Sequence, residues 1–138
     1  MKTFIKRFIL LVFECSIVQS LSSGAPSRIC GSMMPFHGGA SSQSCQSNYV
    51  IQASKYQYSI TVQGATSSNY FIGILLVAKD ASGVNILGSW SSTDSLVQVI
   101  SCNGTSSNGV THTSSTRKSQ IQATWSSPYI VPQGNIVI

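Results

Sequence analysis

Charged residues are scarce in this chain. Asp, Glu, Lys and Arg make up 8% of the 138 residues, and only three residues are acidic. So few charges exclude a coiled coil and a polyelectrolyte tail, while the 42% of hydrophobic residues excludes a disordered chain. Serine is abundant instead, with 27 copies. A surface covered by hydroxyl and amide groups is typical of β-rich extracellular modules.

The chain also lacks the motifs of common catalytic and cofactor sites. It has no Gly-x-Ser-x-Gly nucleophile elbow, no Gly-rich phosphate loop and no haem motif. A paired-carboxylate site would need both Asp80 and Asp94, which stand in turn-like contexts. No Cys-x-x-Cys or His-x(3–5)-His pair exists, which favours structural or surface roles for His37 and His112 over zinc ligation. We therefore expect no catalytic residue, no metal and no cofactor.

No hydrophobic run reaches the roughly 20 residues that a membrane-spanning helix needs, so we expect no stable membrane insertion. Three basic residues precede the apolar run 8–13 and small residues follow it, which predicts a secretory signal peptide over residues 1–24. Cleavage after Ser20 and cleavage after Gly24 both satisfy the small-residue rule. The predicted location of the mature chain is extracellular. Removal of the three basic residues and Glu14 lowers the formal net charge from +5 to +3.

The rest of the chain shows short stretches with β character and no good helix. The expected strands lie at 49–51, 56–62, 71–78, 84–90, 96–100, 110–113, 119–125 and 134–138. The nearly continuous apolar run 71–78 is suited to a central strand, and 103–109 is expected to be a polar loop. About seven or eight strands at this spacing predict an immunoglobulin-like antiparallel β-sandwich, with a closed small barrel as the alternative.

Several local patterns, taken together and in order, resemble the reeler domain. The matching pieces are Gly24-Ala25-Pro26-Ser27, Cys30, Met34-Pro35-Phe36-His37-Gly38, Phe71–Lys79, Ile86-Leu87-Gly88, Cys102, Val110–Ser115 with Lys118, and Trp125-Ser126-Ser127-Pro128. The resemblance covers residues 25–138. It departs from the family at Ile138, where the family continues with another strand, so we expect the last edge strand to be truncated. The family's two histidine motifs also imply hydrogen-bonding roles at loop corners for His37 and His112.

Three cysteines remain after the leader, namely Cys30, Cys45 and Cys102. A disulfide is the default in a secreted chain, but sequence alone leaves all three pairings open. The resemblance implies the pair Cys30–Cys102. Cys45 is then a free thiol or forms an intermolecular bridge.

Two surface features point to modification and to binding. Asn103-Gly104-Thr105 is a glycosylation acceptor in a polar segment, and we expect it to be used. Arg117 and Lys118 are the centre of a weak basic patch for sulfated glycans or microbial anions, with the scattered cations Arg28, Lys55 and Lys79. Basic and aromatic residues are not interleaved, so no nucleic-acid partner is expected.

The resemblance to short reeler proteins implies a secreted, non-enzymatic binding protein in innate defence, with microbial surface glycans as partners. Reelin and the spondins imply an alternative, an extracellular-matrix or adhesion module that binds heparin-like glycosaminoglycans or a partner protein. A third possibility is a fragment of a ferric-chelate reductase ectodomain. The sequence does not indicate the oligomeric state.

Overall fold

A computed structural model describes residues 21–34, 48–53 and 58–127. Within these ranges the chain forms one 3-10 turn, η1 (Ser27–Ile29), and seven strands. The strands are β1 (Tyr49–Ala53), β2 (Ser59–Gly64), β3 (Leu75–Leu76), β4 (Ser89–Ser91), β5 (Val97–Cys102), β6 (Thr105–His112) and β7 (Gln120–Ser126).

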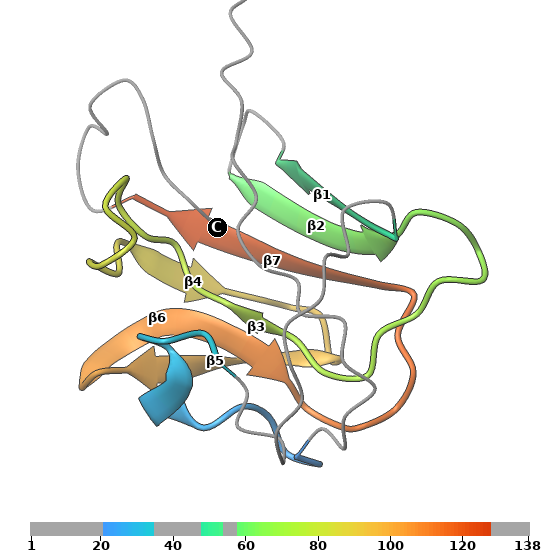
Figure 1. Ribbon diagram of the computed structural model, residues 1–138, viewed down its shortest axis with the longest axis horizontal. Helices are drawn as coiled ribbons and strands as arrows, with labels where there is room; N and C mark the ends of the chain where they lie inside the picture. The colour runs from blue at the N-terminus through green and yellow to red at the C-terminus, as the bar shows by residue number, and fades with distance from the viewer. Residues whose placement is uncertain (1–20, 35–47, 54–57, 128–138) are drawn as a thin grey trace, which may run out of the picture.

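The strands form two antiparallel sheets that pack face to face (Figure 1). One sheet has the order β1-β2-β7-β4 and the other has the order β3-β6-β5. The predicted antiparallel β-sandwich is therefore confirmed. The alternative of a closed barrel is wrong for the described strands, because they divide between two separate sheets.

The four-stranded sheet follows directly from alternating sequence patterns. Along β7, Ile121, Ala123 and Trp125 are buried, and the residues between them face outward or are only partly covered. On β2, Ile60 and Val62 are buried and pair with Ala123 and Ile121. This period of two places one apolar face against the core and one polar face in water.

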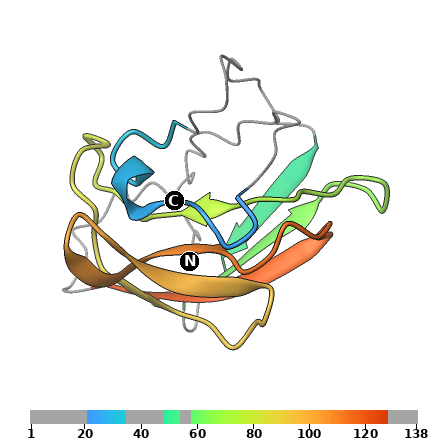
Figure 2. The same ribbon diagram turned by 90° about the horizontal axis from the view of Figure 1, so that it is seen from below.

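The three-stranded sheet has apolar contacts on both faces. On one face, Leu76, Val97 and Val110 belong to the main core between the sheets. A second cluster contains Cys30, Val77 and Cys102 with the partly buried Met33, Leu75, Ile86 and Ile100. The N-terminal segment 21–34, blue in Figures 1 and 2, lies against this sheet and carries η1. The half of β6 that follows Ser107 is consequently buried at every residue.

The apolar run 71–78 does not form the expected central strand. Only Leu75–Leu76 is regular, and this strand, β3, is at the edge of its sheet with β6 as its one partner. Instead, Phe71 at the start of the run makes an isolated bridge to Lys118, and Lys79 just after the run makes one to Ile86. Most of its side chains are nevertheless buried. A continuous apolar run indicates that a segment is buried, but it does not show how. Here the segment is buried because it packs between layers, and not because it has a strand on either side.

The expected polar loop 103–109 is a tight hairpin. Asn103-Gly104 forms a two-residue turn between the paired residues Cys102 and Thr105, and β6 begins at Thr105. Both turn residues have positive φ, 52° and 78°, as a type I′ turn requires. An Asn-Gly pair is a strong hairpin signal. The hydroxyl-rich residues after it are exposed, so a strand there needs no apolar pattern.

Several expectations fall outside the described residues. They concern the leader up to residue 20, His37, Cys45, Lys55 and the last apolar stretch at 134–138.

The predicted turn at Asp80 is present, with Gly83 N–H donating to Asp80 O at 2.9 Å. The Asp80 carboxylate accepts hydrogen bonds from the Ser82 hydroxyl and the Asn85 side-chain amide, both at 2.6 Å. It also accepts from the backbone N–H groups of Val84 and Asn85. These donors, the Ser82 hydroxyl first, lower the pKa of Asp80 from 3.8 to about 2.

We expect Asn85→Ala to raise the pKa of Asp80 toward 3.8, as measured by NMR titration of its carboxyl carbon. Because the folded-state pKa is the lower one, the carboxylate's stabilising contribution is complete above pH 3.8 and is lost as pH falls toward 2. Val84→Ala is the matched control, since Val84 contributes only its backbone N–H. An unchanged titration midpoint in Asn85→Ala would contradict the prediction.

Candidate functional site

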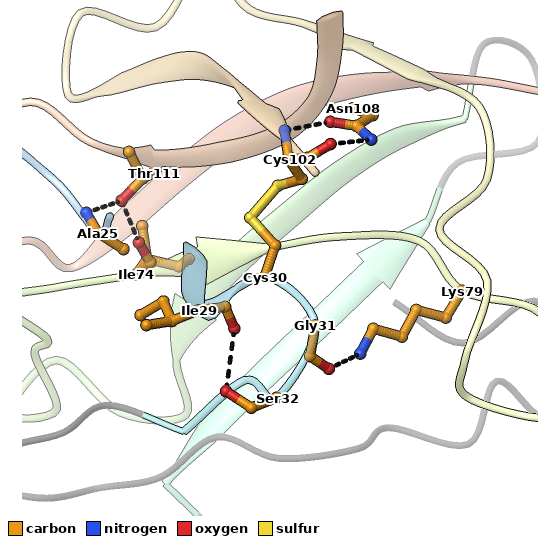
Figure 3. Close-up of a disulfide and its surroundings, with 10 residues drawn as sticks. All are labelled: Ala25, Ile29, Cys30, Gly31, Ser32, Ile74, Lys79, Cys102, Asn108 and Thr111. Carbon is orange, nitrogen blue, oxygen red and sulfur yellow. Dashed lines mark hydrogen bonds between the residues drawn. A yellow bond between two sulfur atoms is a disulfide. The ribbon is translucent and has the colours of Figure 1, made fainter. Parts of the chain in front are cut away.

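One disulfide ties the N-terminal segment to the three-stranded sheet (Figure 3). Cys30 follows η1 directly and Cys102 ends β5; the two are 72 positions apart in the sequence, and their Cα atoms are 5.8 Å apart. This is the pair that the family resemblance implies. Around it, Lys79 Nζ donates to the Gly31 carbonyl at 2.7 Å.

The disulfide is built into the interior and serves a structural role. Both cysteines are fully buried. The Asn108 side chain accepts from Cys102 N–H at 2.6 Å and donates to Cys102 O at 3.1 Å, which fixes the end of β5. A Cβ on Gly109 would lie 2.7 Å from Cys102 Sγ, so only glycine leaves room for the sulfur there.

His112 ends β6 and holds two other segments by hydrogen bonds. Its ring is 3% exposed, and Nδ1 accepts from Ile74 N–H at 3.1 Å. With Nδ1 accepting, Nε2 carries the proton and donates to Leu21 O at 2.8 Å. The buried Thr111 hydroxyl donates to Ile74 O and accepts from Ala25 N–H, both at 2.8 Å. His112 therefore has the structural, hydrogen-bonding role that the sequence and the resemblance favour.

The carboxylates of the described residues accept hydrogen bonds from groups within the protein. Asp94 accepts from Leu96 N–H and from Gln122 N–H, both at 2.9 Å, and so links the segment before β5 to β7. Asp80 is occupied within its own turn. Across residues 21–34, 48–53 and 58–127, no three His, Cys, Asp or Glu side chains lie together as a metal site would need. Over the same residues, no helix is long and apolar enough to cross a membrane.

The structure separates the two cations that were expected to bind anions together. Lys118 is 2% exposed, and its ammonium donates to the carbonyls of Ile72, Ser114 and Thr116 at 2.6 to 2.8 Å. Burial lowers the pKa of Lys118 from its ordinary 10.5. All three ammonium protons have protein acceptors, so the expectation that Lys118 binds an external anion is wrong. A lysine does not have to lie at the surface when three backbone carbonyls accept hydrogen bonds from its ammonium group.

Arg117 is the exposed member of the pair, and it stacks on an exposed aromatic ring. Its guanidinium carbon lies 4.3 Å from the centroid of the Tyr70 ring, which is 42% exposed. Backbone hydrogen bonds in both directions between Phe71 and Lys118 hold the two segments side by side. Tyr49 on β1 donates its hydroxyl to Tyr70 O at 2.7 Å.

The Tyr70–Arg117 surface, defined by these two side chains, leaves the edge of the guanidinium available. Within the part of the chain that the structure describes, the Arg117 side chain has the Tyr70 ring as its partner and no carboxylate. A planar guanidinium held against an aromatic ring presents donors that match carboxylate, sulfate and phosphate groups. This arrangement can bind an anionic group.

Sequence reasoning identified Arg117 but missed Tyr70, to which it assigned no role. It also missed the roles of Asn108 and Thr111, although Thr111 lies in the matched motif Val110–Ser115, because hydroxyl and amide side chains are common throughout this stretch. Asn103, the predicted glycosylation site, is exposed at the tip of the β5–β6 hairpin. Its use as an acceptor stays a prediction.

The fold and these sites define a disulfide-linked β-sandwich with a fastened N-terminal segment. The family model described as "Reeler domain" matches residues 28–138. The chain belongs to the reeler domain family, as the sequence motifs indicated.

The chain is similar to two curated relatives, and it covers a different share of each one's length. "Putative ferric-chelate reductase 1" of Danio rerio is 36% identical over 95% of this chain, which spans only 24% of that protein's length. "Putative defense protein 3" of Antheraea mylitta is 31% identical over 87% of this chain and 75% of its own length. Among solved structures, the human F-spondin reeler domain (fragment 1) matches with a TM-score of 0.45 and 24% identity, covering 63% of this chain and 64% of its own.

Proposed function

We propose that this protein is a secreted binding module of innate defence that recognises anionic glycans on microbial surfaces and has no catalytic activity of its own. The observation that carries the proposal is the Tyr70–Arg117 surface. It offers an exposed aromatic ring beside a guanidinium that has no carboxylate partner among the described residues. Chemical groups of this kind bind a charged substituent and the apolar face of a sugar ring together.

The contacts around Tyr70 and Arg117 support this proposal, because they hold the two side chains in a defined arrangement. Stacking on Tyr70 restricts the Arg117 side chain before any ligand arrives, which lowers the entropy lost on binding. The Tyr49 hydroxyl bond and the Phe71–Lys118 bridge fix the backbone beneath the ring. The site is therefore preorganised although it is on the surface.

The defence role is supported by the similarity to "Putative defense protein 3" of Antheraea mylitta, of whose length the chain covers 75%. A second candidate is supported by the 36% identity with the zebrafish protein. In that case this domain would be the extracellular part of a longer, ferric-chelate reductase-like protein. Sequencing the transcript downstream of the Ile138 codon separates the two, since a cytochrome-type membrane region would favour the second candidate.

We expect Arg117→Ala to weaken binding to immobilised lipopolysaccharide about tenfold, equivalent to about 1.4 kcal/mol. Surface plasmon resonance on the secreted protein measures this loss. Rising salt should weaken wild-type binding, because an exposed ionic contact is screened. Tyr70→Ala should lower the affinity as well, through loss of the platform that orients the guanidinium.

Arg28→Ala is the matched control, because Arg28 is an exposed arginine on η1, in the N-terminal segment. It should change the affinity less than about twofold. Equal losses in the two arginine variants would contradict a defined site. Tight binding to heparin with none to lipopolysaccharide would contradict the microbial role and favour the adhesion alternative.

A further inference from the structure

Residues 21–25, at the end of the predicted leader 1–24 and just after it, pack against the folded domain. Side chains of β5 and β6 hold residues 21–25 at three points. His112 Nε2 donates to Leu21 O at 2.8 Å, Gln98 Nε2 donates to Ser23 O at 2.7 Å, and Thr111 Oγ1 accepts from Ala25 N–H. These contacts join residues that are 75 to 91 positions apart.

The backbone conformation and the close contacts at position 24 favour glycine. It is buried, and its φ of 108° lies in a region that residues with a side chain rarely adopt. A Cβ on Gly24 would lie 2.6 Å from Thr111 Cγ2 and 2.8 Å from the His112 carbonyl oxygen. The backbone of this segment thus approaches β6 as closely as the chain permits.

The two cleavage bonds that the sequence allows have different consequences for these contacts. Cleavage after Gly24 would remove the Leu21 and Ser23 carbonyls, and the buried His112 Nε2–H would lose the acceptor at 2.8 Å. Loss of a partner by a buried donor is unfavourable. Cleavage after Ser20 keeps all three of the hydrogen bonds made by Leu21, Ser23 and Ala25.

We propose that signal peptidase hydrolyses the Ser20–Leu21 bond and that Leu21–Gly24 remains as an N-terminal clamp on β5 and β6. The reaction consumes one water and leaves a carboxylate on Ser20 and an α-amino group on Leu21. The mature protein therefore begins with Leu21-Ser22-Ser23-Gly24. The clamp is independent of glycan binding, because none of its residues belongs to the Tyr70–Arg117 surface.

The test is to express the full chain in a eukaryotic secretory host and determine the first residue by N-terminal sequencing and intact mass. Leu21 is the expected first residue. A secreted chain that starts at Ala25, or one that retains Met1, would overturn the proposal.

A pair of glycine variants tests whether the clamp stabilises the mature protein. Gly24→Ala should lower the thermal midpoint of the secreted protein by at least about 5 °C, and its small side chain leaves both cleavage bonds acceptable. Gly31→Ala is the control, because nothing lies within 4 Å of the position of its Cβ. If Gly24 were removed with the leader, its substitution would leave the midpoint unchanged and the proposal would be wrong.

A second measurement covers the case in which Gly24→Ala is not secreted. Chains that start at Leu21 or at Ala25 can be produced behind a tag whose protease leaves no extra residue. The chain that starts at Leu21 should have the higher thermal midpoint by at least about 5 °C. Equal midpoints would show that residues 21–24 contribute nothing and would overturn the proposal.

Discussion

Removing the disulfide, in the double variant Cys30→Ala and Cys102→Ala, should lower the free energy of unfolding by about 4 kcal/mol. The bond closes a loop across 72 positions, and an unfolded chain without that closure has much more conformational freedom. The loss is comparable with the whole stability of many small domains, which is about 5 kcal/mol at the low end. Urea unfolding of the mature protein, followed by tryptophan fluorescence, measures it.

Cys45→Ala is the matched control, because it makes the same chemical change at a cysteine outside the observed bond. Its unfolding midpoint should stay close to that of the wild type. Reduction of the wild-type protein should reproduce the loss seen in the double variant. If Cys45→Ala were as destabilised as the double variant, Cys45 would contribute to stability in a way that the Cys30–Cys102 bond does not explain.

Lys118→Met should lower the free energy of unfolding by about 3 kcal/mol, although the new side chain has a similar length and is apolar. The reason is the carbonyl groups of Ile72, Ser114 and Thr116, which all accept from the one buried ammonium. Met offers them no donor. The burial of these carbonyls is then uncompensated. The side-chain hydrogen bond from Lys118 to Ile72, which joins the loop before β7 to the 71–78 run, is also lost.

Arg117→Met is the control for this substitution, because it removes the neighbouring charge from an exposed position. It should cost less than about 1 kcal/mol in stability, the contribution expected of an exposed cation–π contact. The two variants should also differ in binding, since only Arg117 presents its charge outward. Equal stability of Lys118→Met and Arg117→Met would contradict the buried hydrogen-bonded ammonium.

The class of fold was predictable because strand periodicity is local. On β7, the alternation of Ile121, Ala123 and Trp125 with glutamine and threonine predicts which face is buried, and the structure buries those three residues. β2 behaves in the same way. Where a strand is covered on both faces or on neither, this signal is absent. That is why β6 was expected to be a loop in its exposed first half.

The candidate site was only half predictable. Arg117 and Lys118 are adjacent basic residues in a serine-rich stretch, and nothing local distinguishes them. Their separation depends on the carbonyl of Ile72, 46 positions from Lys118, and on the ring of Tyr70. Which of two neighbouring charges is buried is decided by groups that only the folded chain brings together.

By itself the sequence determined the all-β class, the motifs that mark the family and the turn at Asp80, since each depends on residues close in the chain. Tertiary structure decided that the 71–78 run forms only the short edge strand Leu75–Leu76, that the Lys118 side chain is buried and that Leu21–Gly24 packs against β5 and β6. These outcomes rest on contacts such as His112 with Leu21, 91 positions apart. Hydrogen-bond partners that far apart leave no periodic trace in the sequence, so only packing of the layers reveals them.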